Sequence, residues 1–143
     1  MVQQSFSTTI EVAGSPEQVF HQLTQPSKWW SKDFTGESRQ LNDEFVINHP
    51  GQHYSRQKLV EVMPGHRLVW LVTESKLNWL NNQQEWTNTK MVFALSKHGD
   101  NTLLNFTHEG LVPEKECYQM CSEGWTMVIN KRLFNFITTG KTI

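Results

Sequence analysis

Hydrophobic and polar residues alternate with a period of two along much of this chain, which is the pattern of β-strands with one buried face. In the first such stretch, residues 4–12, one face carries Phe6, Thr8, Ile10 and Val12. Further strands are expected at residues 34–38, 44–48, 53–63, 67–74, 87–96 and 102–109. The alternation therefore predicts a mainly antiparallel β-sheet.

Turn-forming residues separate the later strands. Pro64-Gly65 lies between two long strand patterns, and residues 97–101, Lys-His-Gly-Asp-Asn, lie between the last two. Such short polar and glycine-containing connections are typical of hairpins. Consecutive hairpins predict a meander, in which each strand pairs with the next.

A short helix is expected after the first strand. Ser15 is a good N-cap, Pro16 suits the first helical position, and the apolar residues Val19, Phe20 and Leu23 form one stripe before Pro26 ends the helix. Two adjacent tryptophans follow at 29 and 30. They are not expected both to face one core, so at least one should line an opening or a gap between helix and sheet.

The end of the chain, residues 114–139, has the periodicity of a long amphipathic helix. Its apolar positions recur every three or four residues, and Gly140 follows as a stop signal. A helix of this length covers a whole sheet. Gly124 lies inside it beside Trp125, where glycine costs about 1 kcal/mol relative to alanine. A close backbone approach or free space is expected there.

Residues 76–86 combine asparagine and glutamine with Trp79, Leu80 and Trp86. Because a purely solvated loop does not need these apolar side chains, two interpretations remain open. The segment is either a lid at the rim of a pocket, or a long hairpin tip whose tryptophans fold back onto the sheet.

Length and charge narrow the function classes. The chain has 143 residues, which is the usual size of one domain, so residues 1–143 are treated as one unit. With 13 basic and 14 acidic residues, it has no electrostatic footprint for nucleic acid. No apolar run has the length of a membrane span, and the first residues lack the pattern of a secretory signal. A cytoplasmic location is expected.

Metal, redox and cofactor chemistry have little support in the sequence. Cys117 and Cys121 lie four residues apart in one expected helix and are expected to be free thiols. His49 and His53 lack a third ligand nearby, so no metal site is expected. Phosphate-binding loops, nucleophile elbows and catalytic triads are not recognisable, and no cofactor is expected.

The expected inner face of the sheet carries large apolar side chains, and the room between a curved sheet and a helix is a natural place for a ligand. In the last strand this face holds Leu104, Phe106 and His108. The residues predicted to bind a ligand are Trp30, Trp70, Met91, Phe93, Phe106, His108, Trp125, Val128 and Arg132. A solid core without a cavity is the alternative for the apolar members.

Two of these residues are polar. His108 is the titratable residue on the inner face and either hydrogen-bonds a ligand or is paired with Glu109, a backbone carbonyl or water. Arg132 lies within the apolar stripe of the last helix. It either clamps an anion inside, or extends its stem outward and forms a surface pair.

Four motifs in order resemble the START-like superfamily and, within it, bacterial homologues of the activator of the heat-shock protein 90 ATPase. They are Ser15-Pro16-Glu17-Gln18-Val19-Phe20 leading to Trp29-Trp30, then Pro64-Gly65-His66-Arg67-Leu68, then Thr107-His108-Glu109-Gly110-Leu111, and finally Gly124-Trp125 with Ile129 and Leu133. The resemblance implies an α+β helix-grip fold. In that fold a curved antiparallel sheet wraps around a long C-terminal helix, with two short helices after the first strand.

The resemblance also implies a cavity for an apolar molecule, lipid-like or polyketide-like, as in other members of the superfamily. The prediction is a small cytoplasmic protein that binds an apolar or aromatic small molecule between sheet and helix. The alternative is a chaperone-associated module of the heat-shock protein 90 type, or a stress-response protein. A cyclase or hydrolase would need His108 or Arg132 as acid, base or anion clamp.

Overall fold

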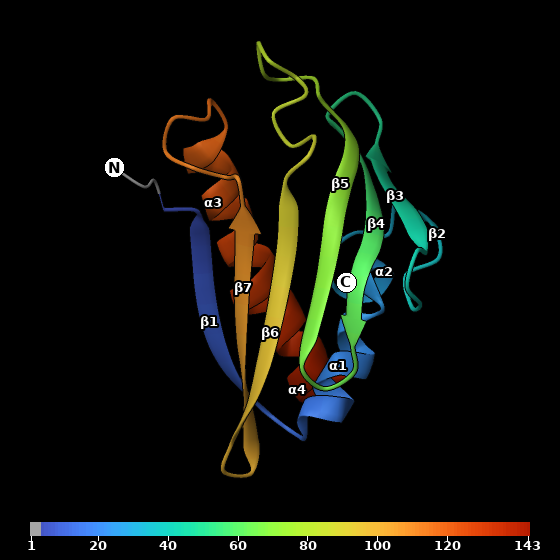
Figure 1. Cartoon of the computed structure of the whole chain (residues 1–143), viewed down its shortest axis with the longest axis vertical. Coiled ribbons are helices and arrows are strands. Elements are labelled where there is room, and N and C mark those ends of the chain that lie inside the picture. Colours follow the sequence, from blue (N-terminus) through green and yellow to red (C-terminus); the bar gives the residue numbers. More distant parts are fainter. Residues whose placement is uncertain (1–3) are drawn as a thin grey trace.

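Residues 4–143, which a computed structural model describes, contain one antiparallel sheet of seven strands in the order β1-β7-β6-β5-β4-β3-β2 (Figure 1). Successive strands from β2 to β7 pair with their neighbours, and β1 closes the order beside β7. The strands are β1 (Phe6–Ala13), β2 (Phe34–Gly36), β3 (Glu44–His49), β4 (His53–Met63), β5 (Arg67–Leu77), β6 (Lys90–His98) and β7 (Asn101–Glu109). The meander predicted from the hairpin turns is confirmed.

The helices lie on one face of this sheet (Figure 1). They are α1 (Pro16–Leu23), α2 (Pro26–Trp29), α3 (Tyr118–Met127), the π-helical η1 (Val128–Leu133) and α4 (Phe134–Thr139). The last three follow one another without a break, and we call them together the C-terminal helix. A curved sheet around one long helix, with two short helices after the first strand, is the helix-grip fold, as expected.

The period-of-two pattern correctly predicts which strand side chains are buried. In β7, Leu104, Phe106 and His108 are buried while the residues between them are only partly covered. The neighbouring rows of β6 and β5 are buried in register with them, because Phe93 pairs with Phe106 and with Leu68. The inner face predicted from the period of two is therefore the face that meets the helices.

Several strand ends differ from the expectation, most strongly at the start of β6 and at the end of β5. Residues 87–89, expected in a strand, form a turn in which the Thr87 N–H donates to the Gln84 carbonyl and Asn88 has a φ of 69°. β5, expected to end at residue 74, continues to Leu77 because β4 pairs with it as far as His53. A bulge in β5 at this pairing shifts its register, which the sequence alternation did not reveal.

The short helix α1 begins as predicted. Ser15 accepts from the Gln18 N–H at 3.2 Å, and the Gln18 side chain accepts from the Ser15 N–H at 3.1 Å, which makes a complete capping box. α2 then places both tryptophans in the core, so the expectation that Trp29 and Trp30 cannot share one core is wrong. Both rings stack on Trp70, each with a centroid distance of 6.0 Å.

The C-terminal helix begins at Tyr118 and not at residue 114 as predicted. Residues 112–118 form tight turns instead, and the Glu85 carboxylate accepts hydrogen bonds from the amides of Glu116 and Cys117 at 2.9 and 3.0 Å. Helix ends need such partners for their free amides. The end of the helix is as predicted, since Gly140 adopts a left-handed φ of 75°.

The segment 76–86 lies at the end of the sheet where α3 begins (Figure 1). Leu77, Leu80 and Trp86 are buried, whereas Trp79 is 44% exposed. The segment therefore folds back onto the core at three apolar positions and leaves one tryptophan at the surface.

In the part of the chain covered by the structure, no helix combines the length and apolar character needed to cross a bilayer.

Candidate functional site

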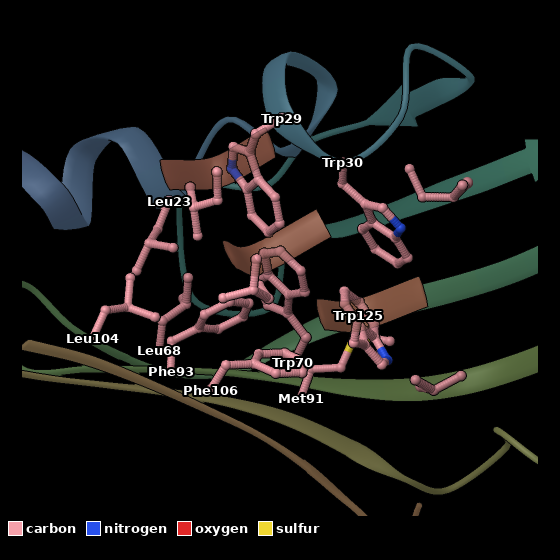
Figure 2. Packing of buried hydrophobic residues seen from close by; sticks show 14 of the residues in the cluster. Leu23, Trp29, Trp30, Leu68, Trp70, Met91, Phe93, Leu104, Phe106 and Trp125 are labelled. Atoms are coloured by element: carbon pink, nitrogen blue, oxygen red, sulfur yellow. The ribbon is translucent and has the colours of Figure 1, made fainter. Parts of the chain in front are cut away.

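The middle of the layer between sheet and helices is filled by aromatic rings (Figure 2). Trp70 lies 4.8 Å from Phe93 between ring centroids, and Phe93 lies 5.1 Å from Phe106. All three side chains and Met91 are fully buried. The structure thus places four of the predicted ligand-binding residues in close packing, where the alternative of a solid core applies.

An open space remains at the end of the layer near residues 76–86. It has a volume of about 190 Å³, and we call it the aromatic pocket. The residues that line it are Trp30, His53, Trp79, Trp86, Met120, Cys121, Gly124, Trp125 and Val128. Of the predicted ligand-binding residues, Trp30, Trp125 and Val128 are here.

Four aromatic rings of this pocket are neighbours in a closed circuit. The Trp125 centroid lies 5.1 Å from Trp30 and 5.8 Å from Trp86, and His53 lies 6.2 Å from Trp30 and 5.0 Å from Trp86. Trp86 and Trp125 are nearly parallel, with planes 14° apart. These rings come from four separate parts of the chain: the end of α2, the start of β4, the segment before β6, and α3.

The lack of a side chain at Gly124 accounts for part of the open space in the aromatic pocket. A Cβ atom built on this residue would have no other atom within 4 Å apart from the helix itself. Of the two expectations for this glycine, free space is confirmed and a close backbone approach is wrong.

His53 is a neutral wall of the pocket. Burial, with a smaller effect from the charge of His49, lowers the pKa of His53 to about 4. Its Nε2 shares a hydrogen bond of 2.7 Å with Ser55 Oγ. The lining side chains from the described part of the chain include no lysine, arginine, aspartate or glutamate.

His108 lies behind the pocket wall and is fully buried. The Trp125 indole N–H donates to its Nδ1 at 3.0 Å, and its Nε2 is 2.8 Å from Thr89 Oγ1. Since the Thr89 hydroxyl itself donates to the Trp86 carbonyl, it accepts from His108 Nε2–H. The imidazole is therefore neutral with both nitrogens paired, and burial together with the charge of Lys115 lowers its pKa to about 3.

In the structure, the hydrogen-bond partners of His108 are not the ones that the sequence analysis considered. Its partners are two side chains from other elements, and not Glu109, a backbone carbonyl or water. With no free lone pair and a low pKa, the ring is not available as a general base in this arrangement. It fixes two walls of the pocket, Trp86 through Thr89 and Trp125 directly.

Arg132 is exposed, and its guanidinium does not enter the aromatic pocket. Its Nη1 donates to the backbone carbonyl of Trp30 at 3.2 Å. The inward anion clamp is therefore wrong, and no carboxylate pairs with Arg132 among residues 4–143. Arg132 instead ties η1 to the end of α2.

Comparisons with known proteins agree with the fold. The family described as Activator of Hsp90 ATPase homolog 1-like protein matches residues 13–136, nearly the whole chain. The chain belongs to this family. The Aha1 dimer of Colwellia psychrerythraea is similar in structure, with 22% identity, coverage of 99% of both chains and a TM-score of 0.77.

Other proteins with this fold have a lower sequence identity with this chain. DynU16, a putative protein of the dynemicin biosynthetic locus, has 14% identity and a TM-score of 0.70, with coverage of 99% of this chain and 49% of that chain. Protein MLL2253 of Mesorhizobium loti has 19% identity and a TM-score of 0.69, with coverage of 89% and 93%. A search among proteins of curated function found no match. The family match shows the family, the structural likenesses show the fold, and the site must be argued from this chain.

The two cysteines of this family member are buried and do not form a disulfide bond. Its hydrogen bond to the sulfur of Cys117, together with burial, raises the pKa of Cys121, which lines the pocket. A thiol with a raised pKa is a poor nucleophile. Groups of three or more potential metal ligands do not occur in the described residues, and His49 pairs with Asp33 at 2.9 Å.

Sequence reasoning missed several walls of the pocket, namely His53, Trp86, Met120 and Cys121. Two signals pointed to them. The apolar residues in the polar segment 76–86 indicated either a lid at a pocket or a tip folded back onto the sheet, and Gly124 indicated either free space or a close backbone approach. Neither signal shows that β4 would bring His53 beside them.

Proposed function

We propose that this protein binds a small, neutral, planar aromatic molecule in the aromatic pocket. The observation that carries this proposal is an unfilled space of about 190 Å³ bordered by Trp30, Trp86 and Trp125 and opened by Gly124. Ring-on-ring contacts add about 0.5–1.5 kcal/mol each beyond area burial. Aromatic walls on several sides therefore favour a flat ring over a flexible chain.

The size of the pocket limits the ligand. An apolar cavity of about 150 Å³ holds one benzene ring, whereas pockets for drug-sized ligands measure about 300–1,000 Å³. The aromatic pocket, at about 190 Å³, fits one ring with small substituents. A sterol, a long acyl chain or a polycyclic polyketide needs more room than this.

Binding is favoured over catalysis by the state of the polar groups. His108 is paired at both nitrogens, His53 has a pKa of about 4, and Arg132 is engaged outside the pocket. A protein that only binds a neutral ligand does not need these groups as an acid, a base or an anion-binding cation.

The test uses fluorobenzene observed by ¹⁹F NMR and the substitution Gly124→Leu, whose side chain would occupy the pocket. We expect saturable binding to the unaltered protein and at least tenfold weaker binding to Gly124→Leu. Glu123→Leu is the matched control, because residue 123 is exposed on the same helix and outside the lining. Equal binding to all three proteins, or no binding to any, would refute the proposal.

A second candidate is a chaperone-associated function, favoured by the family and by an apolar surface on α3. Met120 and Met127 are 64% and 50% exposed and lie two helical turns apart on the same side, with Trp79 beside Met120. Exposed methionines are common on surfaces that adapt to protein partners. The test is the ATPase rate of a heat-shock protein 90 chaperone with and without this protein. Stimulation that Met120→Lys and Met127→Lys abolish would support this function, and an unchanged rate would exclude it.

A further inference from the structure

His53 is the imidazole among the side chains that line the aromatic pocket in the described part of the chain. It begins β4, and Ser55 follows two residues later on the same inner face of the sheet. The two side chains share the 2.7 Å hydrogen bond between His53 Nε2 and Ser55 Oγ. The direction of this bond decides whether the other ring nitrogen, Nδ1, donates or accepts.

The surroundings of Ser55 set that direction. Ser55 is fully buried, and among residues 4–143 its hydroxyl has no partner other than His53. If Nε2 carried the hydrogen, the hydroxyl proton of Ser55 would be buried without an acceptor, which is costly. The hydroxyl therefore donates and Nε2 accepts. Because the imidazole is neutral, its single hydrogen is then on Nδ1.

This second nitrogen borders open space. Nδ1 of His53 has no hydrogen-bond partner among residues 4–143, yet it is not one of the unpaired atoms there that are sealed inside the protein. Since His53 lies on the inner face of β4 and lines the aromatic pocket, the space that Nδ1 meets is this pocket. A ligand in the pocket therefore lies beside an unpaired N–H group.

The rest of the lining offers hydrogen-bond donors but no strong acceptor among its side chains. It contains four indoles, each with one N–H donor and no acceptor, namely Trp30, Trp79, Trp86 and Trp125. The sulfur atoms of Met120 and Cys121 accept only weakly. Gly124 and Val128 add no polar side-chain atom. A ligand that matches these side chains must bring an acceptor of its own.

We propose that His53 is the polar anchor of the ligand and that the ligand is an aryl ketone or aldehyde, a single aromatic ring that bears a carbonyl group. The ring lies between the tryptophans, and the carbonyl oxygen accepts from Nδ1–H of His53. A carbonyl brings an acceptor and no donor, whereas the O–H of a phenol or the N–H of an amide would enter this lining without a strong acceptor. A carboxylate would enter it without a cation, since no lysine or arginine side chain lines the pocket in the described residues. This inference rests on the proposed function and narrows its ligand class.

The tautomer of His53 is tested first, without any ligand. Two-bond ¹H–¹⁵N correlation spectra of the ¹⁵N-labelled protein at pH 7.5 distinguish the ring nitrogen that carries hydrogen from the one that does not. We expect the hydrogen on Nδ1, with the signals assigned to His53 by their loss in a His53→Phe variant. Hydrogen on Nε2 would make Nδ1 an acceptor and would overturn the proposal.

The binding experiment compares two probes of the same shape, 4-fluoroacetophenone and 4-fluoro-α-methylstyrene, in which a CH₂ group replaces the carbonyl oxygen. Dissociation constants for both are measured by ¹⁹F NMR on the unaltered protein and on two double variants, His53→Phe with Ser55→Ala and His53→Leu with Ser55→Ala. Ser55→Ala removes the hydroxyl that would otherwise lose its only partner, and with two double variants one folded protein is enough. His98→Phe is the matched control, an exposed histidine outside the lining in the hairpin of β6 and β7, at the other end of the sheet (Figure 1).

We expect the preference for 4-fluoroacetophenone over its CH₂ counterpart, taken as the ratio of their dissociation constants, to be about fivefold lower in the His53 variants than in the unaltered protein. The reason is that a carbonyl in the pocket then loses its hydrogen bond. His98→Phe should keep the unaltered ratio. If this ratio is the same in all four proteins, or if fluorobenzene binds and neither of these probes does, the anchor is refuted and the aromatic pocket stands. If none of the three probes binds the unaltered protein, both proposals are refuted.

Discussion

The indole N–H of Trp125 donates a 3.0 Å hydrogen bond to Nδ1 of His108, and this bond joins the C-terminal helix to the last strand inside the core. Because that nitrogen must accept, the imidazole is neutral as long as the bond exists. The other nitrogen continues the chain of hydrogen bonds to Thr89 and the Trp86 carbonyl. One buried histidine thus holds two tryptophans of the aromatic pocket in position.

This arrangement predicts that stability depends on pH. Burial lowers the pKa of His108 to about 3 and that of His53 to about 4, both below the unfolded value near 6.5. As the pH falls through 6.5 the unfolded chain takes up protons at these two histidines that the folded chain does not, so their effect on stability is negligible well above this pH and grows below it. The slope per histidine is about 1.4 kcal/mol per pH unit down to its folded pKa.

Urea unfolding at pH 7.5, 6.5 and 5.5 measures this effect. We expect a small loss of unfolding free energy between pH 7.5 and 6.5 and a clearly larger loss between pH 6.5 and 5.5. His108→Gln should lower the unfolding free energy at every pH. It should also reduce the loss of unfolding free energy between pH 6.5 and 5.5 by the part that one histidine contributes. A loss of the same size in this variant would show that His108 is not the titrating group.

Two glycines should respond to alanine in opposite directions. Gly124 has helical geometry and open space around a new Cβ, so Gly124→Ala should stabilise the protein by about 1 kcal/mol. At Gly36 the new Cβ would lie 2.4 Å from the Glu44 carbonyl oxygen, with a φ of 117°. Gly36→Ala should therefore destabilise by more than about 2 kcal/mol, because neither the strand pairing nor the backbone angle can adapt.

Thermal unfolding of both glycine variants checks this contrast. A lower melting temperature for Gly124→Ala would mean that the space beside this residue is filled in solution. That result would also count against the aromatic pocket.

Glu85 is expected to stabilise the turn at which α3 begins. Its carboxylate accepts from the amides of Glu116 and Cys117, which have no partner inside the helix. Glu85→Ala should cost about 0.5–2 kcal/mol, as the loss of a capping residue does. Chemical denaturation measures the cost, and Glu123→Ala on the same helix is the control, since Glu123 is exposed and makes no ion pair among those of the described residues. Equal stability of both variants would contradict the capping role.

Gln57 should reduce the stability of the free protein. Gln57→Met removes a buried amide without hydrogen bonds and keeps a side chain of similar length, so it should stabilise by about 1–3 kcal/mol in the absence of ligand. The measurement is the unfolding free energy in urea without added probe. Destabilisation would indicate that the amide is paired in solution, for example by a buried water molecule.

Much of the fold could be predicted because its signals are local. The capping sequence at Ser15, the turn at Pro64-Gly65 and the alternation in β7 each depend on residues close together in the chain. The start of the C-terminal helix could not be predicted in this way. The two amides just before it are bound by Glu85, about 30 residues earlier in the chain, so periodicity alone placed the start too early.

The candidate site likewise has some features that the sequence predicts and others that it does not. The sequence by itself determined that large apolar side chains and His108 face one layer, and that Gly124 marks either free space or a close backbone approach beside Trp125. Only the tertiary structure decided which of them fill that layer, since Trp70, Phe93 and Phe106 obey the same patterns as Trp30 and Trp125 but pack against one another. Whether a ring fills space or borders it depends on how volumes from distant segments fit together. β4 brings His53 to this place only through long-range pairing.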